Sequence, residues 1–469
     1  MNTTNPTVIK GKNVQIWMCG GSAGETLAVR GEGPAYASFS GAEENGVKYC
    51  VLSHENRLAL NECVPWTKPS ALGTDGITIG LGDRTGLFGA AQLEAIEKSE
   101  ARPVLAQQSL RELSLTGRTY QDVIDCASFA VFKRGWTKGW GADGDHLKRF
   151  EAIENALNAG CSMITLDCSE VLKKAPANPA ALEKAYGEFD RHLRADYEAL
   201  YLKNGNACPQ GVAFTKESLM KSALVYHDAI SLAMRVYNEL IEPLERKIDF
   251  EISLDETEEV TTYEGHCFVA SELKRHRVAI TSLAPRFVGE FHKGVDYKGS
   301  EKAFSENLRV HAAIAKRFGY KISIHSGSDK FSIFPMVAEI TEKRFHLKTS
   351  GTSWLMAAKA IAELDPQLYR EMHRCALKHF EEARAYYFVH ADPAKVPDVA
   401  TLSDRQLPTL FDADDSRQLI HITYGFMFSD PALKERIFSA LKANKEKADD
   451  VVRANILKHL NALRITKAL

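Results

Sequence analysis

Apolar and polar positions along this chain repeat the order of a buried strand, a polar loop and an amphipathic helix. This pattern predicts strands at 77–83, 103–107, 162–167, 249–255, 279–284, 321–325 and 345–348, and helices at 92–98 and 147–157. The run at 127–132 fits either another strand or part of a helix. Strands that alternate with helices predict a parallel sheet. The chain length and the many polar strand ends favour an α/β fold with a closed (β/α)8 barrel of the TIM type over an open sheet.

The pattern divides the chain into a small N-terminal unit and a large barrel unit. Residues 1–65 contain glycine-rich turns and short strand-like runs, which predict a β-rich extension. Residues 66–469 form the predicted catalytic barrel. Within it, a helical insertion is expected at about 176–238, with a polar break at 203–209. The alternation resumes at 247 and runs to about 362, and a helical tail follows at 369–387 and 430–463.

Composition narrows the class of protein. The chain has 469 residues, of which 45% are hydrophobic and 26% charged, as in a globular protein. A formal net charge of −2 offers no basic footprint for nucleic acid, and no apolar run is long enough for a membrane span. The N-terminal sequence lacks the features of a secretory signal. Nine scattered cysteines without a Cys-x-x-Cys pair predict free thiols in a reducing cytoplasm.

Polar chemistry gathers at the predicted strand ends. Along 249–256, alternation places Glu251, Ser253 and Asp255 on one face, which in a barrel points inward. Inward carboxylates are costly unless they are paired, hydrated or bound to a metal, so this run indicates a site. Glu256 follows directly and can turn toward the same mouth. The alternative is a solvated strand end, which the following Thr-Glu-Glu favours.

Three histidines follow or end predicted elements and are candidate metal ligands. His146 follows Asp145 at a predicted junction between a loop and a helix, where Asp145 could instead cap the helix. His292 comes shortly after a strand end that carries Arg286. His325 ends an apolar strand and precedes a Ser-Gly-Ser-Asp-Lys loop. The alternatives are a surface residue for His292 and a core residue for His325.

Several cationic and glycine-rich segments complete the set of candidates. Lys330 and Lys348 could bind an anionic substrate, or form a Schiff base if buried, or simply be solvated. The segment 80–86 lacks the dinucleotide-binding spacing and is interpreted as a barrel loop whose Arg84 would anchor a carboxylate or phosphate. The Gly-x-Ser-x-Gly pattern around Ser22 fits a nucleophile elbow less well than a flexible turn.

Six ordered motifs resemble the tagaturonate/fructuronate epimerase family. They are Gly-Leu-Gly-Asp-Arg at 80–84, Gly-Ala-Asp-Gly-Asp-His-Leu-Lys at 141–148, Ser-Leu-Asp-Glu-Thr at 253–257, Leu-Ala-Pro-Arg-Phe-Val-Gly at 283–289, His-Ser-Gly-Ser-Asp-Lys-Phe-Ser at 325–332 and Phe-His-Leu-Lys-Thr-Ser-Gly-Thr-Ser-Trp at 345–354. The resemblance implies a metal-dependent barrel enzyme that interconverts D-fructuronate and D-tagaturonate by inversion at C4. It covers about 75 to 360 in order.

The implied reaction constrains the chemistry. The substrate has a ketone at C2 and a hydroxyl at C4, so proton abstraction next to the carbonyl cannot invert C4. Inversion needs transient oxidation or retro-aldol cleavage of C3–C4 with re-addition, and the sequence offers no credible nicotinamide site. Retro-aldol chemistry needs an electrophile, which a divalent metal supplies, and a carboxylate base. Histidine and carboxylate ligands suit zinc, manganese, nickel or iron without choosing among them.

The resulting hypothesis gives every candidate a role. His146, His292 and His325 hold the metal, Asp145 accepts the proton, and Glu251 or Glu256 is the opposing acid. The substrate contacts are assigned to Arg84, Asp255, Arg286, Lys330 and Lys348. Two other functions stay open, a class II-type metal-dependent aldolase that releases its fragments and a non-catalytic protein that binds sugar acids. The expected partner is a small sugar acid, and a homo-oligomer is possible.

Overall fold

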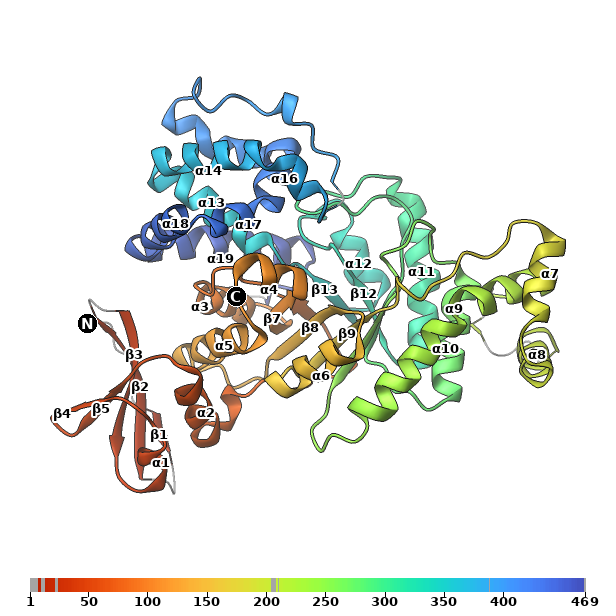
Figure 1. The fold of residues 1–469 in the computed structure, drawn as a ribbon, viewed down its shortest axis with the longest axis horizontal. Helices are drawn as coiled ribbons and strands as arrows, with labels where there is room; N and C mark the ends of the chain where they lie inside the picture. Colours follow the sequence, from red (N-terminus) through yellow and green to blue (C-terminus); the bar gives the residue numbers. More distant parts are fainter. Residues whose placement is uncertain are drawn as a thin grey trace.

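The computed structural model describes residues 7–9, 13–21, 24–203, 208–209, 211–387 and 389–467, and its centre is a closed parallel barrel (Figure 1). Within these residues the barrel order is β10-β11-β12-β13-β6-β7-β8-β9, which confirms the predicted TIM-type fold. The strands are β6 Thr78–Gly80, β7 Arg102–Ser109, β8 Gly141–Leu147, β9 Met163–Asp167, β10 Asp249–Ser253, β11 Ser282–Ala284, β12 Lys321–Ile324 and β13 Phe345–Lys348.

Helices follow each barrel strand and cover its outer face. They include α3 Gly89–Glu97, α4 Leu110–Thr116, α5 Tyr120–Arg134, α6 Phe150–Ala159, α9 Lys216–Val236, α10 Tyr263–Arg275, α11 Glu301–Phe318, α12 Phe334–Ile340 and α13 Thr352–Leu364. The undecided run at 127–132 lies inside α5, whose first turn is closed by a capping box between Thr119 and Asp122. The apolar faces of these helices pack against the strands and form the main core.

The N-terminal unit is a separate antiparallel sheet. Its strand order is β1-β2-β3-β5-β4, with bounds β1 Thr7–Ile9, β2 Val14–Gly21, β3 Gly24–Gly31, β4 Ala42–Glu44 and β5 Val47–Cys50. The helices α1 Pro34–Ala37 and α2 His54–Cys63 accompany it. Its small core includes Ile16, Leu27 and Leu60 and reaches Phe129 and Phe132 of α5. Ser22, the centre of the proposed elbow, lies outside the described residues.

The predicted helical insertion lies in the connection from β9 to β10. It contains α7 Pro179–Gly187, α8 Arg191–Glu198 and α9, with π-helical turns at Ala199–Lys203 and Tyr237–Ile241. A disulfide joins Cys208 of this connection to Cys267 of α10. The expectation of free thiols throughout was therefore wrong for this pair, because spacing along the chain says nothing about which cysteines meet in the fold.

The C-terminal helices form a second layer beside the barrel, drawn in blue in Figure 1. They are α14 Pro366–Lys378, α15 Phe380–Arg384, α16 Asp414–Ile422, α17 Tyr424–Ser429, α18 Pro431–Ala443 and α19 Lys445–Ala462, with 3-10 turns Pro393–Lys395 and Asp404–Asp412. Trp354 of α13 is buried and donates its indole N–H to the carbonyl of Ile420 at 2.9 Å. None of the helices within the described ranges combines the length and apolarity needed to cross a membrane.

Candidate active site

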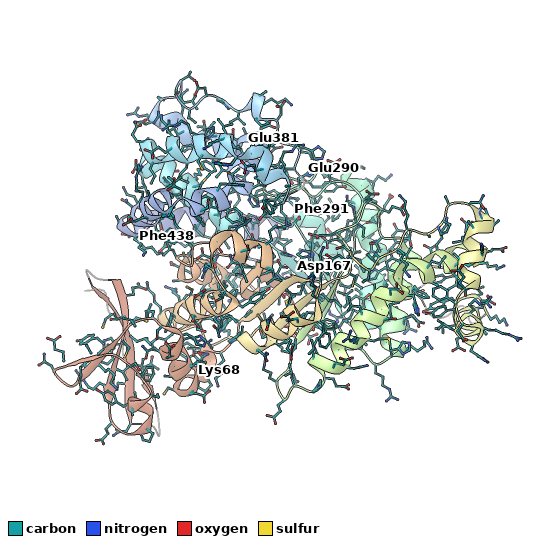
Figure 2. The ribbon with its side chains drawn as sticks, in the orientation of Figure 1. Lys68, Asp167, Glu290, Phe291, Glu381 and Phe438 are labelled. Carbon is teal, nitrogen blue, oxygen red and sulfur yellow. A yellow bond between two sulfur atoms is a disulfide. The ribbon has the colours of Figure 1, made fainter. Side chains whose placement is uncertain are left out.

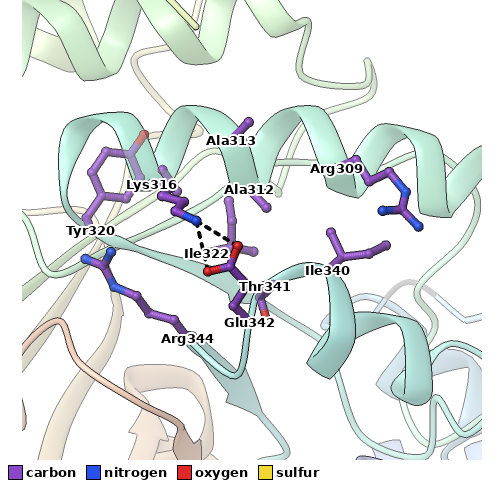
Figure 3. Close-up of a pocket in the computed structure, with 11 residues that line it drawn as sticks. Arg309, Ala312, Ala313, Lys316, Tyr320, Ile322, Ile340, Thr341, Glu342 and Arg344 are labelled. Atoms are coloured by element: carbon purple, nitrogen blue, oxygen red, sulfur yellow. Dashed lines mark hydrogen bonds and ion pairs between the residues drawn. The ribbon is translucent and has the colours of Figure 1, made fainter.

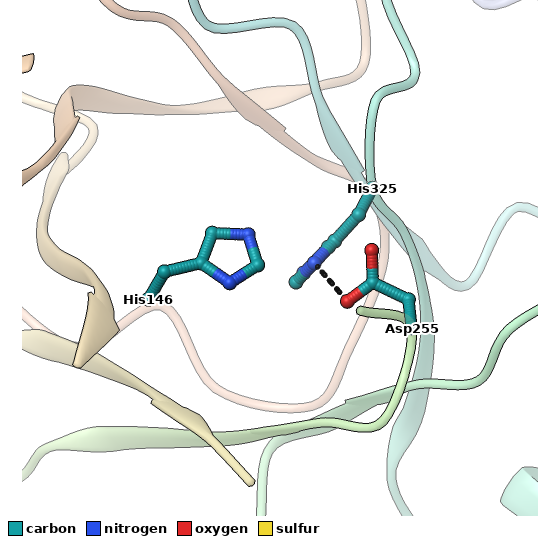
Figure 4. Close-up of side chains that lie close together, drawn as sticks. All are labelled: His146, Asp255 and His325. Carbon is teal, nitrogen blue, oxygen red and sulfur yellow. Dashed lines mark hydrogen bonds and ion pairs between the residues drawn. The ribbon is translucent and has the colours of Figure 1, made fainter. Parts of the chain in front are cut away.

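Two imidazoles and one carboxylate meet at the carboxyl ends of the barrel strands. His146 lies near the end of β8, Asp255 lies two residues beyond β10, and His325 directly follows β12. One ligand atom from each lies within 4.8 Å of the others, and the two imidazole rings meet edge to face with centroids 5.0 Å apart (Figure 4). We call these three residues the strand-end group. In (β/α)8 barrels this end carries the catalytic residues.

The backbone around this group is bent out of regular strand geometry. The pairing of β8 with β9 shifts register between Gly144 and Leu147, and within this shift His146 has a φ of 52°. Ser326, next to His325, has a φ of 48°. Residues other than glycine rarely adopt this conformation, and such strain gathers at functional sites. The interpretation of Asp145 as a helix cap was wrong, because Asp145 lies in β8 and the residue before α6 is Arg149.

A buried carboxylate supports the strand-end group from inside the barrel. Glu251 is fully buried and lies 2.7 Å from Nε2 of His325, while Asp255 lies 3.0 Å from Nδ1 of the same ring. Ser282 and Thr165 donate hydrogen bonds to Glu251. Burial opposes charge on this ring, but Asp255 and Glu251 outweigh it and raise the pKa of His325 to about 10.

The inward-facing polar residues continue down the barrel as a hydrogen-bonded network. Gln107 donates to Asp143 at 3.0 Å, and Thr165 donates to the same carboxylate at 2.9 Å. Burial, with Asp145 and Glu251 nearby, raises the pKa of Asp143 to about 8. This network requires glycine at position 80, because a Cβ there would overlap the side-chain amide of Gln107.

Lys348, the last residue of β13, forms a buried ion pair with Asp145. Each side chain is almost fully buried, at 2% and 3% exposure. Burial disfavours both charges, but the partners outweigh it, so the pKa of Asp145 is lowered and that of Lys348 is raised. A buried pair of this kind holds both side chains in one arrangement beside the two histidines.

A pocket of about 570 Å³ opens above the strand-end group. His146, Asp255 and His325 line it, and Arg111, Arg286 and Lys293 add cationic groups to its walls. Burial, with Lys348 and Arg111 nearby, lowers the pKa of Lys293. Among the carboxylates proposed for proton transfer, Glu256 lines the pocket, whereas Asp145 and Glu251 lie beneath it. The pocket can therefore receive an anion against a histidine-bearing floor.

The sequence analysis missed several residues of this pocket. Arg111 follows the end of β7, so the rule that polar residues follow strand ends could have found it. Tyr386 and Tyr387 reach the pocket from the segment after α15, and Arg111 lies 4.4 Å over the ring of Tyr387. Nothing in the sequence around these tyrosines indicates a site. Asp167, the last residue of β9, lies 3.3 Å from Nδ1 of His146.

The described structure does not bring the three candidate histidines into one group. His292 gathers instead with Glu290 and His390, again with ligand atoms within 4.8 Å. We call these three residues the loop group, since Glu290 and His292 follow β11 and His390 follows α15. Glu290 lies where the barrel meets the C-terminal helices (Figure 2). Phe291 and Lys293 of the same loop line the pocket, whereas His292 between them lies against Glu290 and His390.

Two of the predicted substrate-binding cations are engaged elsewhere. Arg84 is buried, donates to Glu112 at 2.6 Å and 2.8 Å, and lies 3.8 Å over the ring of Tyr424. Lys330 is fully buried and donates to the backbone carbonyls of His292, Val295 and Ser328. Burial lowers the pKa of Lys330 to about 7. Neither side chain belongs to the described lining of the pocket.

A second hollow, of about 420 Å³, lies between α11 and α12 on the outside of the barrel (Figure 3). Its centre is an exposed ion pair between Lys316 and Glu342. Tyr320 and Arg344, which also line it, precede β12 and β13, so this hollow lies at the amino ends of the strands. In this fold that end supports stability rather than catalysis.

The strand-end group has the donor chemistry of a divalent metal site. Imidazole nitrogens and a carboxylate oxygen suit first-row transition metals, and Glu251 and Asp167 stand behind the rings as orienting carboxylates. Asp255 and Glu251 lie on either side of the His325 ring and raise its pKa, so the carboxylates favour a positive charge between them. A divalent cation would replace that proton. The three residues therefore fit a metal ion.

These features define a (β/α)8-barrel enzyme with a histidine- and carboxylate-based candidate site beneath a pocket with cationic walls. The model of the UxaE family, described as tagaturonate epimerase, matches residues 8–463. The chain belongs to this family, so it is an epimerase and thus an isomerase.

Named relatives agree with this membership over nearly the whole chain. A tagaturonate/fructuronate epimerase of Thermotoga maritima is 41% identical over 94% of this chain and 92% of its own length. The crystal structure of the fructuronate-tagaturonate epimerase UxaE from Cohnella laeviribosi, native or with glycerol, is 44% identical with a TM-score of 0.95. It covers 98% of this chain and 96% of its own.

Proposed function

We propose that this enzyme interconverts D-fructuronate and D-tagaturonate by metal-dependent inversion at C4. The observation that carries the proposal is the strand-end group on the floor of a pocket with cationic walls. The pocket volume of about 570 Å³ is ample for a six-carbon sugar acid. The names of the relatives supply the particular substrates.

The cationic wall gives the substrate its orientation. Arg286 lines the pocket with no hydrogen bond or ion pair from its guanidinium to any other described residue, and Lys293 and Arg111 lie along the same cavity. Guanidinium groups bind carboxylates through two parallel hydrogen bonds. We assign Arg286 to the substrate carboxylate, with Lys293 and Arg111 supporting it. The sugar chain then lies with C2 to C4 over His146 and His325.

The bond changes follow a retro-aldol path. Glu256 accepts the proton of the C4 hydroxyl, the C3–C4 bond breaks, and its electron pair moves into an enediolate over C2 and C3. The products held in the pocket are the enediolate of dihydroxyacetone and a three-carbon aldehyde that carries the carboxylate. Rotation of the aldehyde presents its other face, the C3–C4 bond forms again, and the proton returns to O4. A divalent cation bound at the strand-end group supplies electrophilic stabilisation of the negative charge.

The remaining candidates position the reacting groups. Glu251 holds the ring of His325, and Asp167 holds that of His146. The pair of Lys348 and Asp145 keeps a fixed dipole beside both rings. Asp255 completes the donor set.

The test is an NMR time course of D-fructuronate with purified enzyme, before and after removal of metal with EDTA and after reloading. We expect D-tagaturonate to form only with metal. Formation of D-tagaturonate by the metal-free enzyme would overturn the proposed metal dependence. Steady accumulation of free three-carbon fragments would instead identify an aldolase, and tight binding without conversion would identify a sugar-acid binding protein.

A further inference from the structure

The guanidinium of Arg111 reaches the pocket wall with most of its hydrogen-bond donors uncommitted. Arg111 lines the pocket and donates from Nη1 to the backbone carbonyl of Tyr386 at 2.9 Å. Its Nε is buried without a hydrogen-bond partner, and no carboxylate forms an ion pair with it, among the described residues. Arginine carries five N–H donors, so this side chain can still bind an anion.

A closed chain of contacts holds this guanidinium from the side of the C-terminal helices. Arg111 lies 4.4 Å from the ring centroid of Tyr387, whose hydroxyl lies 2.7 Å from that of Tyr424. Arg84 lies 3.8 Å from the ring centroid of Tyr424 and donates two hydrogen bonds to Glu112. Glu112 follows Arg111 in α4, so the chain returns to its starting point. We call these five residues the arginine–tyrosine network.

The network is buried except where it meets the pocket. Tyr424 is fully buried, and Arg84, Glu112 and Tyr387 are almost fully buried. Burial raises the pKa of both tyrosines, so their hydroxyls stay neutral and keep the hydrogen bond between them. Hydrogen bonds and contacts between a cation and an aromatic ring are stronger away from water. The network therefore restricts the position of the Arg111 guanidinium.

Four parts of the fold that are distant in sequence supply the network. Arg84 lies in the loop after β6, and Arg111 and Glu112 lie in the first turn of α4. Tyr387 follows α15, and Tyr424 begins α17. The barrel strand ends carry the strand-end group, whereas both tyrosines come from the C-terminal helical layer. This layer thus acts on the pocket through Arg111.

We propose that the arginine–tyrosine network positions Arg111 to bind the substrate carboxylate together with Arg286. The inference rests on the proposed function, because it concerns recognition of the same sugar acid. Arg111 and Arg286 touch the substrate, while Tyr424 and Arg84 are positioning residues that act through Tyr387. Two guanidinium groups at one carboxylate favour an acid over a neutral sugar, which would leave both charges without a partner.

A double-mutant cycle tests the positioning role. Tyr424→Phe removes the hydroxyl that bonds to Tyr387 and keeps the aromatic ring beside Arg84. We expect it to raise the dissociation constant for D-fructuronate about fivefold, the effect of one hydrogen bond, and to raise KM more than it lowers kcat. Arg111→Met should raise the dissociation constant about tenfold or more. In the Arg111→Met background, Tyr424→Phe should change it by less than about twofold, and equal effects in both backgrounds would overturn the proposal.

Further variants separate positioning from general stability. Tyr369→Phe is the matched control and should bind like wild type, since Tyr369 is a fully buried tyrosine of α14 outside the described lining of the pocket. Tyr387→Phe removes the same hydrogen bond from the pocket side and should weaken binding as much as Tyr424→Phe. The double variant Tyr387→Phe/Tyr424→Phe should bind no more weakly than either single variant. Binding losses that follow the fall in Tm across all variants would indicate general destabilisation and overturn the proposal.

Binding and turnover are measured separately on the enzyme as isolated, by calorimetry and by NMR. A wild type that binds D-fructuronate without converting it would overturn the proposed function and leave the binding comparison valid. A wild type that does not bind D-fructuronate would overturn both. Unchanged binding in Tyr424→Phe and Tyr387→Phe, with a wild type that binds and converts, would overturn this inference alone.

Discussion

The strand-end group and the loop group each contain two imidazoles and one carboxylate, but they differ in how the fold holds them. His146, Asp255 and His325 stand at the ends of strands, over a hydrogen-bonded barrel interior. Glu290 and His390 are exposed, and their positions depend on two connections. The comparison teaches that ligand type alone does not define a catalytic site. The strand-end group stands on a buried, hydrogen-bonded interior, which is the support that a catalytic site needs, whereas two members of the loop group are exposed.

Each group also has its own buried lysine, and the two lysines act differently. Lys348 faces a carboxylate, so its positive charge is kept and its pKa is raised. Lys330 faces backbone carbonyls, and burial lowers its pKa to about 7. The sequence presents both as cations near strand ends. In the structure, one belongs to the electrostatics of the site and the other holds the loop after β11.

The largest expected difference between the groups is in turnover. His325→Asn should lower kcat by at least about 1,000-fold, because it removes a proposed metal ligand and the partner of Glu251. His390→Asn should lower kcat less than about tenfold. Both are measured from initial rates of C4 epimerisation by NMR, with circular dichroism to confirm folding. A loss in His390→Asn equal to that in His325→Asn would place the loop group within the catalytic machinery.

Substitutions of the two lysines should lower the free energy of unfolding by different amounts. Lys348→Met leaves the carboxylate of Asp145 buried without its partner, which should cost about 3–5 kcal/mol in the free energy of unfolding. Lys330→Met should cost less, about 1–3 kcal/mol, since neutral carbonyls lose their donor. Urea denaturation of both variants measures this order. The double variant Asp145→Asn/Lys348→Met should recover part of the loss, and failure to recover would show that the pair does not explain it.

A smaller effect is expected for the cationic wall between the two groups. Arg286→Met should raise KM for D-fructuronate about tenfold or more, because it removes a charge-assisted contact to the carboxylate. Arg286→Lys should fall between this variant and wild type. Steady-state kinetics on the metal-loaded enzyme give both constants. An unchanged KM would assign the carboxylate to Arg111 or Lys293 instead.

The smallest effect concerns acid stability of the metal-free protein. Burial opposes ionisation of Glu251, but His325 outweighs it and lowers the pKa of Glu251 below its unfolded value of about 4.3. A lowered carboxylate pKa contributes stability that is present above pH 4.3 and is lost as the pH falls below it. The free energy of unfolding of Glu251→Gln should therefore fall less than that of wild type between about pH 5 and pH 3.

Glu290→Gln is the matched control in the loop group. The hydrogen bond to His292 also lowers the pKa of Glu290, but this carboxylate is half exposed and solvent screens it. In urea denaturation, the free energy of unfolding of Glu290→Gln should fall between about pH 5 and pH 3 as much as that of wild type. If both variants lost equally little stability on acidification, the difference in burial between Glu251 and Glu290 would not explain their effects.

Local sequence rules predicted most of the barrel correctly and failed where the backbone departs from regular geometry. Alternation in 249–255 placed Glu251 inward, as observed. The same reasoning missed β8, because its glycines and aspartates have low strand propensity and tertiary pairing overrides this. The distortion around His146 arises only from pairing with β9.

The sequence by itself determined the barrel class, the family, and the positions of Asp255 and His325 at strand ends, because the period of a strand and its polar end are local properties. The tertiary structure alone decided that His292 joins Glu290 and His390, that Arg84 pairs with Glu112, and that Cys208 bonds to Cys267. Each of these pairings crosses between elements far apart in the chain. Which residues meet there depends on packing and loop direction, which no local pattern encodes.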